Sequence, residues 1–582
     1  MKTIIRNIRG KEWFLVAGAL LFTAAQVKLE LLFPEYLKDI TALIQSATIE
    51  SGKLLTLCWQ MFAFVAGALI CALLTVLCVA ISSSHITARI RQSVFNKIMD
   101  FSLEEVAKFT TPSLITRCTF DVMQVQMFIS TAPAMLIRSI LTGVMATIGI
   151  WGKHIIWTSI TGGTVALMLA LLSLLILFLT PATMRVNKLT DRLNKISLEH
   201  LTGLRVIQAY NAQHYQQEKF DSVNNSLADT NIYINNRMAL MYPIITLFTS
   251  LTTLLIYFSG VFILRSSEAS HKLHTFSNMI ASATYASQAI MAFLMLVFLM
   301  MMLPRMIASL RRISEVLNEN IKIQDGGGVI VSGNDTGKVE FRNVSFRYPG
   351  AVNDALSGIT FTVNPGQTAA IIGSTGSGKT SILNLIPRLY DVSGGEVIVD
   401  GFNVRDFKLN DLRERLGYVP QKAILFSMSI ADNIGYGDNS RFKPTLENIK
   451  EAAEVGQASE FIEQQEAGYD TEVQQGGKNF SGGQKQRLTI SRAISRNPEI
   501  YIFDDSFSAL DFKTDKILRA KLRETAGNAT IIIVAQRIST IRNADKIIVL
   551  DKGRIAGTGT HEELMSSCQI YREMAESQSI SQ

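Results

Sequence analysis

The 582 residues are too many for one hydrophobic core, so several domains are expected. Hydrophobic residues make up 48% of the chain and charged residues 18%. The apolar residues are concentrated before about residue 305, which indicates a membrane-spanning domain followed by a soluble one. The formal net charge of +7 comes from Lys and Arg spread along the chain, without the basic stripe typical of nucleic-acid binding, so no nucleic-acid partner is expected.

The first half contains runs long enough to cross a hydrocarbon core about 30 Å thick, which takes about 20 apolar residues in a helix. The six runs are 13–33, 54–81, 129–151, 155–180, 240–264 and 277–303. Lys2, Arg6, Arg9 and Lys11 precede the first run without a small-residue cleavage site, so this span is expected to be retained.

The connections between these runs alternate in length and charge. The short ones (34–53, 152–154 and 265–276) carry few cations, whereas the long ones (82–128 and 181–239) carry many. The positive-inside rule therefore places the long connections, both termini and everything after residue 304 in the cytoplasm of a multi-pass plasma-membrane protein. Apolar residues recur at helical spacing in the long connections, as at Ile86, Ile90 and Val94, so the helices are expected to continue out of the membrane.

Three polar residues interrupt the first span. Gln26 and Glu30 are one helical turn apart and share a face, whereas Lys28 points elsewhere. An ionisable residue inside a span is a candidate for substrate contact, although snorkelling near the outer end of the span is the alternative. The sixth span is rich in Met and Phe, which suits a pocket for varied apolar or amphipathic small molecules, or simple packing against protein and lipid.

The soluble half begins after Arg311 and Arg312, where a short helical stretch is expected to end at Asp325 and the three glycines that follow. Strands are expected at Val339–Phe346, Ile359–Val363 and Thr368–Ile372. The predicted domains are a transmembrane domain at 1–312, a linker at 313–337 and a soluble domain at 338–582.

A glycine-rich turn joins the third strand to a helical pattern over 381–389 and matches G-x-x-x-x-G-K-[ST]. The predicted phosphate-binding residues are Gly373, Ser374, Thr375, Gly376, Ser377, Gly378, Lys379, Thr380 and Ser381. In such a loop the backbone N–H groups surround phosphate oxygens, Lys379 supplies a cation for the β- and γ-phosphates, and the Thr380 hydroxyl can bind Mg²⁺.

A second motif follows about 120 residues later, where the apolar strand Ile500–Phe503 ends in Asp504. This pattern is typical of the carboxylate that holds Mg²⁺ through water in nucleotide hydrolases. The motif is weak alone, because many buried strands end in Asp.

Between these motifs lie Ser481, Gly482, Gly483 and Gln484, and with them the soluble half resembles the ATP-binding-cassette (ABC) transporter family. The resemblance implies an α/β P-loop nucleotide-binding domain with ATP and Mg²⁺ as cofactors, after an all-α six-span domain of the exporter type. It also implies that Ser481–Gln484 bind the γ-phosphate held by the opposite subunit. Tyr348 would stack on adenine, Gln421 would contact Mg²⁺ and the attacking water, and Asp511 would belong to the D-loop. The segments Ser102–Arg117 and Leu201–Gln213 would hold the turns that dock onto nucleotide-binding domains.

Two residues depart from the family pattern. Asp505 stands where the family has a catalytic Glu, and Gln536 stands where it has a switch His. The Asp505 carboxylate is shorter by one methylene, about 1.5 Å, and a misplacement of about 1 Å can cost roughly 100-fold in rate. Gln536 can hydrogen-bond but cannot become a cation or relay a proton. Neutral drift in a working site is the alternative to a site that binds ATP and hydrolyses it poorly.

The intact signature at Ser481–Gln484 favours a heterodimer, because ABC domains pair head to tail and this signature would complete a partner's site. The expected partner is a second half-transporter that carries the catalytic Glu and the switch His. The resemblance favours a bacterial multidrug exporter. A lipid or lipopeptide exporter, or a regulatory ATP-binding subunit without hydrolysis of its own, remains the alternative.

Overall fold

The computed structural model describes residues 10–44, 51–266, 268, 271–329, 336–437 and 442–579, apart from the side chains of Leu172, Ile176 and Met301. The chain forms two compact units, Met1–Met99 with Pro112–Glu319, and Asp100–Thr111 with Asn320–Gln582. The cations Lys2, Arg6 and Arg9 and part of the predicted linker, 330–335, lie outside the described residues. The domain boundaries at 312/313 and 337/338 stay predictions.

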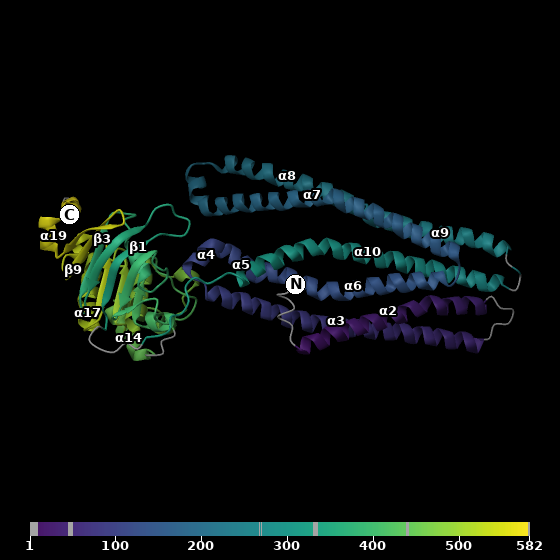
Figure 1. Ribbon diagram of the computed structural model, residues 1–582, viewed down its shortest axis with the longest axis horizontal. Helices are drawn as coiled ribbons and strands as arrows, with labels where there is room; N and C mark the ends of the chain where they lie inside the picture. The colour runs from purple at the N-terminus through teal and green to yellow at the C-terminus, as the bar shows by residue number, and fades with distance from the viewer. Residues whose placement is uncertain are drawn as a thin grey trace. The chain divides into compact units, whose positions relative to one another are not determined.

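The first unit is helical (Figure 1). Its helices are α2 (Gly10–Ile44), α3 (Ser51–Met99), α6 (Val122–Trp151), α7 (Ile155–Ala209), α8 (Gln213–Ala239), α9 (Met241–Ser266) and α10 (Lys272–Leu317). Ahead of α6 lie the short α5 (Thr111–Thr116) and the π-helical turn η1 (Arg117–Asp121). Six helical segments in the described residues are long and apolar enough to span a membrane, as the sequence predicts.

The helices extend further than the apolar runs. Both long connections begin as helix, since α3 continues to Met99 and α7 to Ala209. α2 continues through Pro34 to Ile44, past the apolar run 13–33. One expected end is wrong, because α10 ends at Leu317 rather than near Asp325. Hydrophobicity marks the part of a helix that matches the hydrocarbon, whereas backbone hydrogen bonding decides where the helix itself ends.

Within this unit α2 packs against α3, and α6 packs against α10 (Figure 1). One hydrophobic cluster joins Val27 of α2, Ile150 of α6, Ile256 of α9 and Met279 of α10. Met279 is 6% exposed, so this Met of the sixth span belongs to the packed core rather than to an open pocket.

Ion pairs join η1 to the last turns of α10. Asp121 is fully buried at the end of η1, and its Oδ2 accepts a hydrogen bond from Arg312 Nε at 2.7 Å. Arg117, at the start of η1, donates to Glu315 Oε2 at 3.0 Å. The π turn thus carries both side chains that bind the last turns of α10.

The second unit contains two β-sheets. The strands are β1 (Val339–Phe346), β2 (Leu356–Val363), β3 (Thr368–Gly373), β4 (Gly394–Val399), β5 (Phe402–Asn403), β6 (Leu416–Val419), β7 (Ile500–Asp504), β8 (Thr530–Val534), β9 (Lys546–Asp551) and β10 (Arg554–Gly559). An antiparallel sheet has the order β2-β1-β4-β5, and a second sheet has the order β10-β9-β3-β8-β7-β6. All neighbours in the second sheet are parallel except β10 with β9.

The short helix α4 (Leu103–Phe109) belongs to this unit although it precedes the strands in the chain. The helices that follow the first strands are α11 (Lys379–Leu385), α12 (Leu409–Glu414), α13 (Ile430–Ile434), α14 (Leu446–Val455), α15 (Ser459–Glu463), α16 (Gly482–Ser495), α17 (Phe512–Ala526), α18 (Ile538–Ile541), α19 (His561–Ser567) and α20 (Gln569–Ser579). The helix after the glycine-rich turn is shorter than the predicted 381–389. The unit is an α/β domain with its core on both faces of the parallel sheet.

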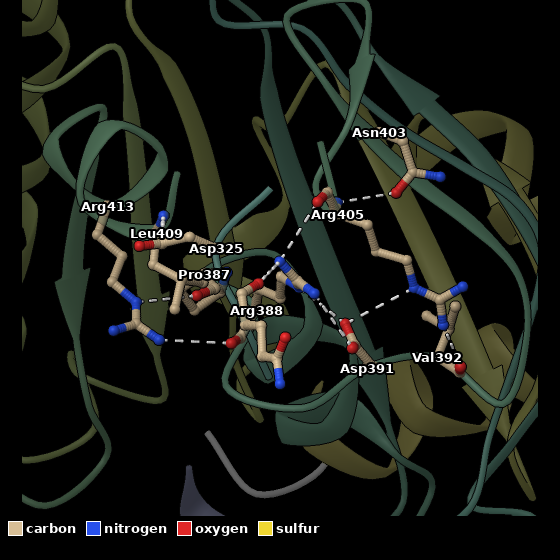
Figure 2. Close-up of polar contacts among 10 residues, drawn as sticks. Asp325, Pro387, Arg388, Asp391, Val392, Asn403, Arg405, Leu409 and Arg413 are labelled. Atoms are coloured by element: carbon tan, nitrogen blue, oxygen red, sulfur yellow. Dashed lines mark hydrogen bonds and ion pairs between the residues drawn. The ribbon is translucent and has the colours of Figure 1, made fainter. Parts of the chain in front are cut away.

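The segment that follows α10, residues 320–329, is bound to the rest of the second unit by the polar contacts in Figure 2. Arg388 is 5% exposed, donates to Asp391 Oδ1 at 2.9 Å and donates to the Gln324 carbonyl at 2.9 Å. The Asp325 carboxylate accepts from Leu409 N at 2.8 Å and so caps α12, whose own N-cap residue is a lysine. A Cβ at Gly326 would overlap the Arg405 carbonyl, so the close approach of this segment requires glycine.

The same segment contacts α4. Ser102 and Glu105 form a capping box at the start of α4, and the Glu105 carboxylate also accepts from Lys322 N at 3.2 Å. Lys322 forms an ion pair with Glu104. The first predicted docking segment, Ser102–Arg117, is thus divided: its part up to Thr111 belongs to the second unit and its part from Pro112 to the helical unit, and its docking stays a prediction. The second, Leu201–Gln213, is the turn between α7 and α8 in the helical unit, and its docking stays a prediction.

Candidate nucleotide-binding site

The predicted phosphate-binding, metal-binding and catalytic residues lie at the carboxyl ends of four adjacent parallel strands. β3 leads into the glycine-rich loop, β7 ends at Asp504, and β6 and β8 lead to Gln421 and Gln536. The carboxyl edge of an open parallel sheet is where such domains bind ligands. Sheet topology therefore gathers residues that are up to 163 positions apart, from Gly373 to Gln536, around one edge.

The loop after β3 has the conformation that phosphate binding requires. Gly378 has φ of 99°, and a Cβ there would come 3.0 Å from the Ala355 carbonyl oxygen. Gly376 also has positive φ, and Ser374, Thr375 and Gly376 are exposed. Ser377 is 1% exposed, and its Oγ has no hydrogen-bond partner among the described residues, so a buried hydroxyl is available to a bound group.

Lys379 closes this loop. Its Nζ donates to the carbonyl oxygens of Gly373 and Ser374, each at 2.8 Å. Burial lowers the pKa of the Lys379 ammonium, and the nearby carboxylates of Asp505 and Asp504 oppose that shift. The ammonium thus lies at the loop, where incoming phosphate oxygens could replace the two carbonyls as its partners.

Thr380 connects the loop to β7. Its Oγ1 donates to Asp504 Oδ1 at 3.1 Å, and Asp504 is 2% exposed. Burial raises the pKa of the Asp504 carboxyl, while the Thr380 hydrogen bond and the Lys379 charge lower it. A hydroxyl and a carboxylate beside a phosphate loop fit Mg²⁺, which is usually bound by one or two protein oxygens together with water and substrate phosphates.

The other two predicted catalytic residues both donate hydrogen bonds to Asp505. Its Oδ2 accepts from Gln536 Nε2 at 2.8 Å and, more weakly, from Gln421 Nε2 at 3.4 Å. Burial raises the pKa of the Asp505 carboxyl. The hydrogen bonds from the Gln421 and Gln536 amides oppose this shift, and so do the positive charges of Lys379 and Arg537. Both departures from the family pattern therefore contact each other directly, which sequence spacing alone did not indicate.

Tyr348 lies beside the start of α11. Its hydroxyl and the Ser381 Oγ are 2.9 Å apart, and its ring makes edge contacts with Phe346 and Tyr390 at centroid distances of 4.7 and 5.3 Å. These contacts fix an aromatic ring next to the phosphate loop, as an adenine-stacking residue requires.

The signature residues form the start of α16. Ser481 N donates to Gln484 Oε1 at 2.8 Å, and Gln484 N donates to Ser481 Oγ at 3.3 Å, which makes a capping box. Ser481 and Gly482 are exposed. Within the described part of the chain, no hydrogen bond or ion pair joins Ser481–Gln484 to the loop at 373–380.

Asp511 is exposed and caps α17, since its Oδ2 accepts from Thr514 N at 3.0 Å. The backbone N–H of Thr514 lowers the pKa of the Asp511 carboxyl. Asp511 therefore has a structural role as the cap of α17, and its role in the D-loop stays a prediction.

Two further residues near the carboxylates were not predicted. The Ser506 hydroxyl donates to the Val419 carbonyl at 3.1 Å and so connects the end of β6 to the residue after Asp505. Tyr418 lies on β6. Burial, and to a smaller extent the negative charge of Asp504, raises the pKa of its phenol. Both lie at strand ends, but neither belongs to a short motif.

Comparisons with known proteins agree with this architecture. The ABC transporter transmembrane region family matches residues 16–293, and the ABC transporter family matches residues 356–508. An uncharacterized ABC transporter ATP-binding protein of Mycobacterium tuberculosis is 38% identical over 501 residues, which is 84% of each chain. The ATP-dependent lipid A-core flippase of Pseudomonas aeruginosa is 30% identical over 492 residues, 83% of this chain and 79% of the flippase. The solved structure of a bacterial Atm1-family ABC exporter with ATP bound shares the fold, with a TM-score of 0.81, 23% identity and 98% of each chain covered.

The fold and the site define a membrane-spanning transport ATPase in which six apolar helices precede an α/β nucleotide-binding domain. The chain belongs to the ABC transporter family, as a half-transporter of the exporter type. The ABC ATPase domain is one that binds ATP, typically with Mg²⁺.

Proposed function

We propose that this chain is the subunit of a heterodimeric ABC exporter that binds ATP at a degenerate site and completes its partner's catalytic site. The observation that carries the proposal is the Asp505 carboxylate, which accepts hydrogen bonds from the Gln536 and Gln421 amides. A general base must come within about 2.6 to 3.2 Å of the proton that it takes from the attacking water. Here the base is one methylene short, and its Oδ2 accepts from two amides, neither of which can accept a proton.

The exposed signature supplies the other half of the argument. Ser481 and Gln484 are fixed by their capping box and are not joined to this chain's own phosphate loop, so they are available to a second nucleotide-binding domain. In a head-to-tail pair they would contact the ATP that the partner's loop holds. Thr380 and Asp504, with Gln421, would hold Mg²⁺ beside the phosphates on this chain, where the metal neutralises phosphate charge.

The proposed setting is a bacterial plasma membrane with both termini and the nucleotide-binding domain in the cytoplasm. The proposed cargo is an apolar or amphipathic small molecule, as for a multidrug exporter. A lipid cargo is the second candidate, favoured by the resemblance to the lipid A-core flippase. A regulatory subunit that binds ATP without supporting transport is a third, and a neighbouring reading frame that encodes a half-transporter with the Glu and His would disfavour it.

Two substitutions in this chain test the proposal in the co-purified pair. Asp505→Asn should leave steady-state ATPase activity nearly unchanged, because its site contributes little turnover. Ser481→Arg should reduce activity by about 100-fold, because bulk and charge would enter the partner's composite site, where lost transition-state contacts cost that much. Ser566→Arg, an exposed serine on α19, is the matched control and should have no effect. Equal damage from Asp505→Asn and Ser481→Arg would show that the division of labour is wrong.

A further inference from the structure

A cavity of about 430 Å³ lies among α2, α3 and α10 in the helical unit. This volume falls within the range of about 300 to 1,000 Å³ that small-molecule sites occupy. Its wall is largely apolar and aromatic, with Phe33, Met61 and Phe64 among the lining residues. The Tyr36 and Phe64 rings pack at a centroid distance of 5.0 Å across the α2–α3 contact.

Glu30 supplies the charge at this cavity. Its Oε1 accepts from Gln26 Nε2 at 2.8 Å and from Arg138 Nη2 at 3.0 Å, while its Oε2 accepts from Arg138 Nη2 at 3.1 Å. A carboxylate offers about four acceptor positions, so one position on Oε2 is left. The Glu30 side chain is a third exposed and lines the cavity, whereas Arg138 on α6 does not line it.

A second acceptor at the cavity comes from α10. Gln288 lines the cavity, and its buried Oε1 has no hydrogen-bond partner among the described residues. A buried polar atom without a partner destabilises the fold, so such an atom is usually paired with water or a ligand. Among the described lining residues Glu30 is the one charged side chain, and its charge is negative.

From these contacts we infer that the cavity binds the cationic or hydrogen-bond-donating group of an amphipathic compound, with Glu30 as the acceptor. The inference rests on the proposed export function and narrows its cargo. Aromatic faces attract cations, and Met adapts to apolar shapes, so the wall suits the apolar body of such a compound. Arg138 offsets part of the Glu30 charge but does not line the cavity, so the charge on the cavity wall is negative and disfavours amphiphiles with an anionic head.

A structural role for Glu30 is the alternative, because its ion pair with Arg138 also ties α2 to α6. The two roles predict different responses to removal of Arg138. If Glu30 only joins α2 to α6 through its ion pair, replacing Glu30 or Arg138 should change ligand binding equally. If Glu30 binds the ligand, losing Arg138 frees acceptor positions and leaves the negative charge uncompensated.

Binding of two ions with the same tetraphenyl shape and opposite charge tests the inference. The full chain in lipid nanodiscs, without nucleotide, is titrated with tetraphenylphosphonium and separately with tetraphenylborate, and binding to empty nanodiscs is subtracted. Wild type should bind the phosphonium saturably and more tightly than the borate. Glu30→Gln should weaken phosphonium binding by about tenfold or more, equal to about 1.4 kcal/mol. Arg138→Gln should retain or tighten it.

Glu35→Gln is the matched control, because Glu35 lies five residues further along α2, pairs with Lys153 and does not line the cavity. It should leave phosphonium affinity unchanged. Any of four results would overturn the inference: no saturable phosphonium binding, as expected if a lipid chain fills the cavity; equal affinity for both ions; no effect of Glu30→Gln; or equal losses in Glu30→Gln and Arg138→Gln. Since no nucleotide is present, failure here is distinct from failure of the ATPase test of the proposed function.

Discussion

Lys379 shows how a single charge prepares the phosphate loop. Its ammonium donates to two loop carbonyls at 2.8 Å, and phosphate oxygens would offer it stronger, charge-assisted partners. Hydrogen bonds to charged groups are worth about 1.5 to 3 kcal/mol, so Lys379→Ala should weaken ATP binding at this site by about 10- to 100-fold. The measurement is binding of labelled ATP in a pair whose partner site is disabled. Lys516→Ala, an exposed lysine on α17, should keep wild-type affinity. Undiminished binding in Lys379→Ala would contradict the role given to this residue.

The direction of the Asp505 pKa shift predicts how residual hydrolysis depends on pH. Burial raises this pKa above the ordinary value of 3.8, so the carboxyl gains its proton at a higher pH than an exposed aspartate does. Only the ionised form can accept a proton from water. Residual ATPase of this site should therefore decline as pH falls, at a higher pH than an aspartate with the ordinary pKa of 3.8 would give. The pH profile is measured beside a partner that lacks its catalytic Glu. Asp505→Asn should remove this acid limb, and an identical limb in Asp505→Asn would contradict the assignment.

The backbone at Asp505 agrees with the identity of the side chain. Asp505 has φ of 48°, in the left-handed region, where Asp and Asn are enriched over other residues with a Cβ. The short side chain is therefore compatible with the local backbone, even though it withdraws the carboxylate from the expected position of a catalytic Glu.

At the scale of elements, the segment after α10 is attached to the soluble unit through the buried Arg388 in Figure 2. Gly326 N and Gly328 N donate to the carbonyls of Phe407 and Asp406 at 2.9 and 3.0 Å. Arg388→Ala removes the bonds to Gln324 and Asp391, which should destabilise this attachment by about 1.5 to 3 kcal/mol.

Hydrogen–deuterium exchange of peptides that cover residues 320–329 measures this effect. An opening that is easier by about 1.4 kcal/mol exchanges about tenfold faster, so Arg388→Ala should accelerate exchange by at least that factor. Arg405→Ala is the control, because the Arg405 side chain is 46% exposed and its ion pair with Asp391 spans 3.7 Å. An exposed pair contributes about 0 to 1 kcal/mol, so its exchange should change little. Equal acceleration in both variants would show that Arg388 is not the anchor.

For the whole molecule, the proposed asymmetry predicts that this chain alone is a poor ATPase. Any dimer of identical chains would combine an intact signature with Asp505 and Gln536 at both sites. The chain purified alone should bind ATP with Mg²⁺ and turn over about 100-fold more slowly than the pair, the size of effect that a misplaced base produces. Steady-state ATPase of the single chain and of the pair, at equal protein concentration and in the same lipid, is the comparison. If the single chain hydrolysed ATP at the rate of the pair, the proposal that its site is degenerate would be wrong.

The sequence by itself determined the features that depend on nearby residues. Apolar run length identified the six spans, because the thickness of the bilayer sets a minimum helix length. Helical spacing predicted that α3 and α7 continue past their apolar runs. The four-residue spacing of Gln26 and Glu30 predicted that they share a helix face, and their hydrogen bond confirms it. The glycine-rich loop was recognisable because its positive φ angles require glycine at fixed positions.

Tertiary structure alone decided which distant residues meet. Gln421 and Gln536 lie 84 and 31 residues from Asp505, and they reach one oxygen because β6, β7 and β8 are parallel neighbours with their ends at one edge. Arg138, 108 residues from Glu30, was invisible to local patterns. Neither pairing can be found from periodicity or spacing, because strand order and helix packing depend on the burial of the whole chain rather than on any segment of it.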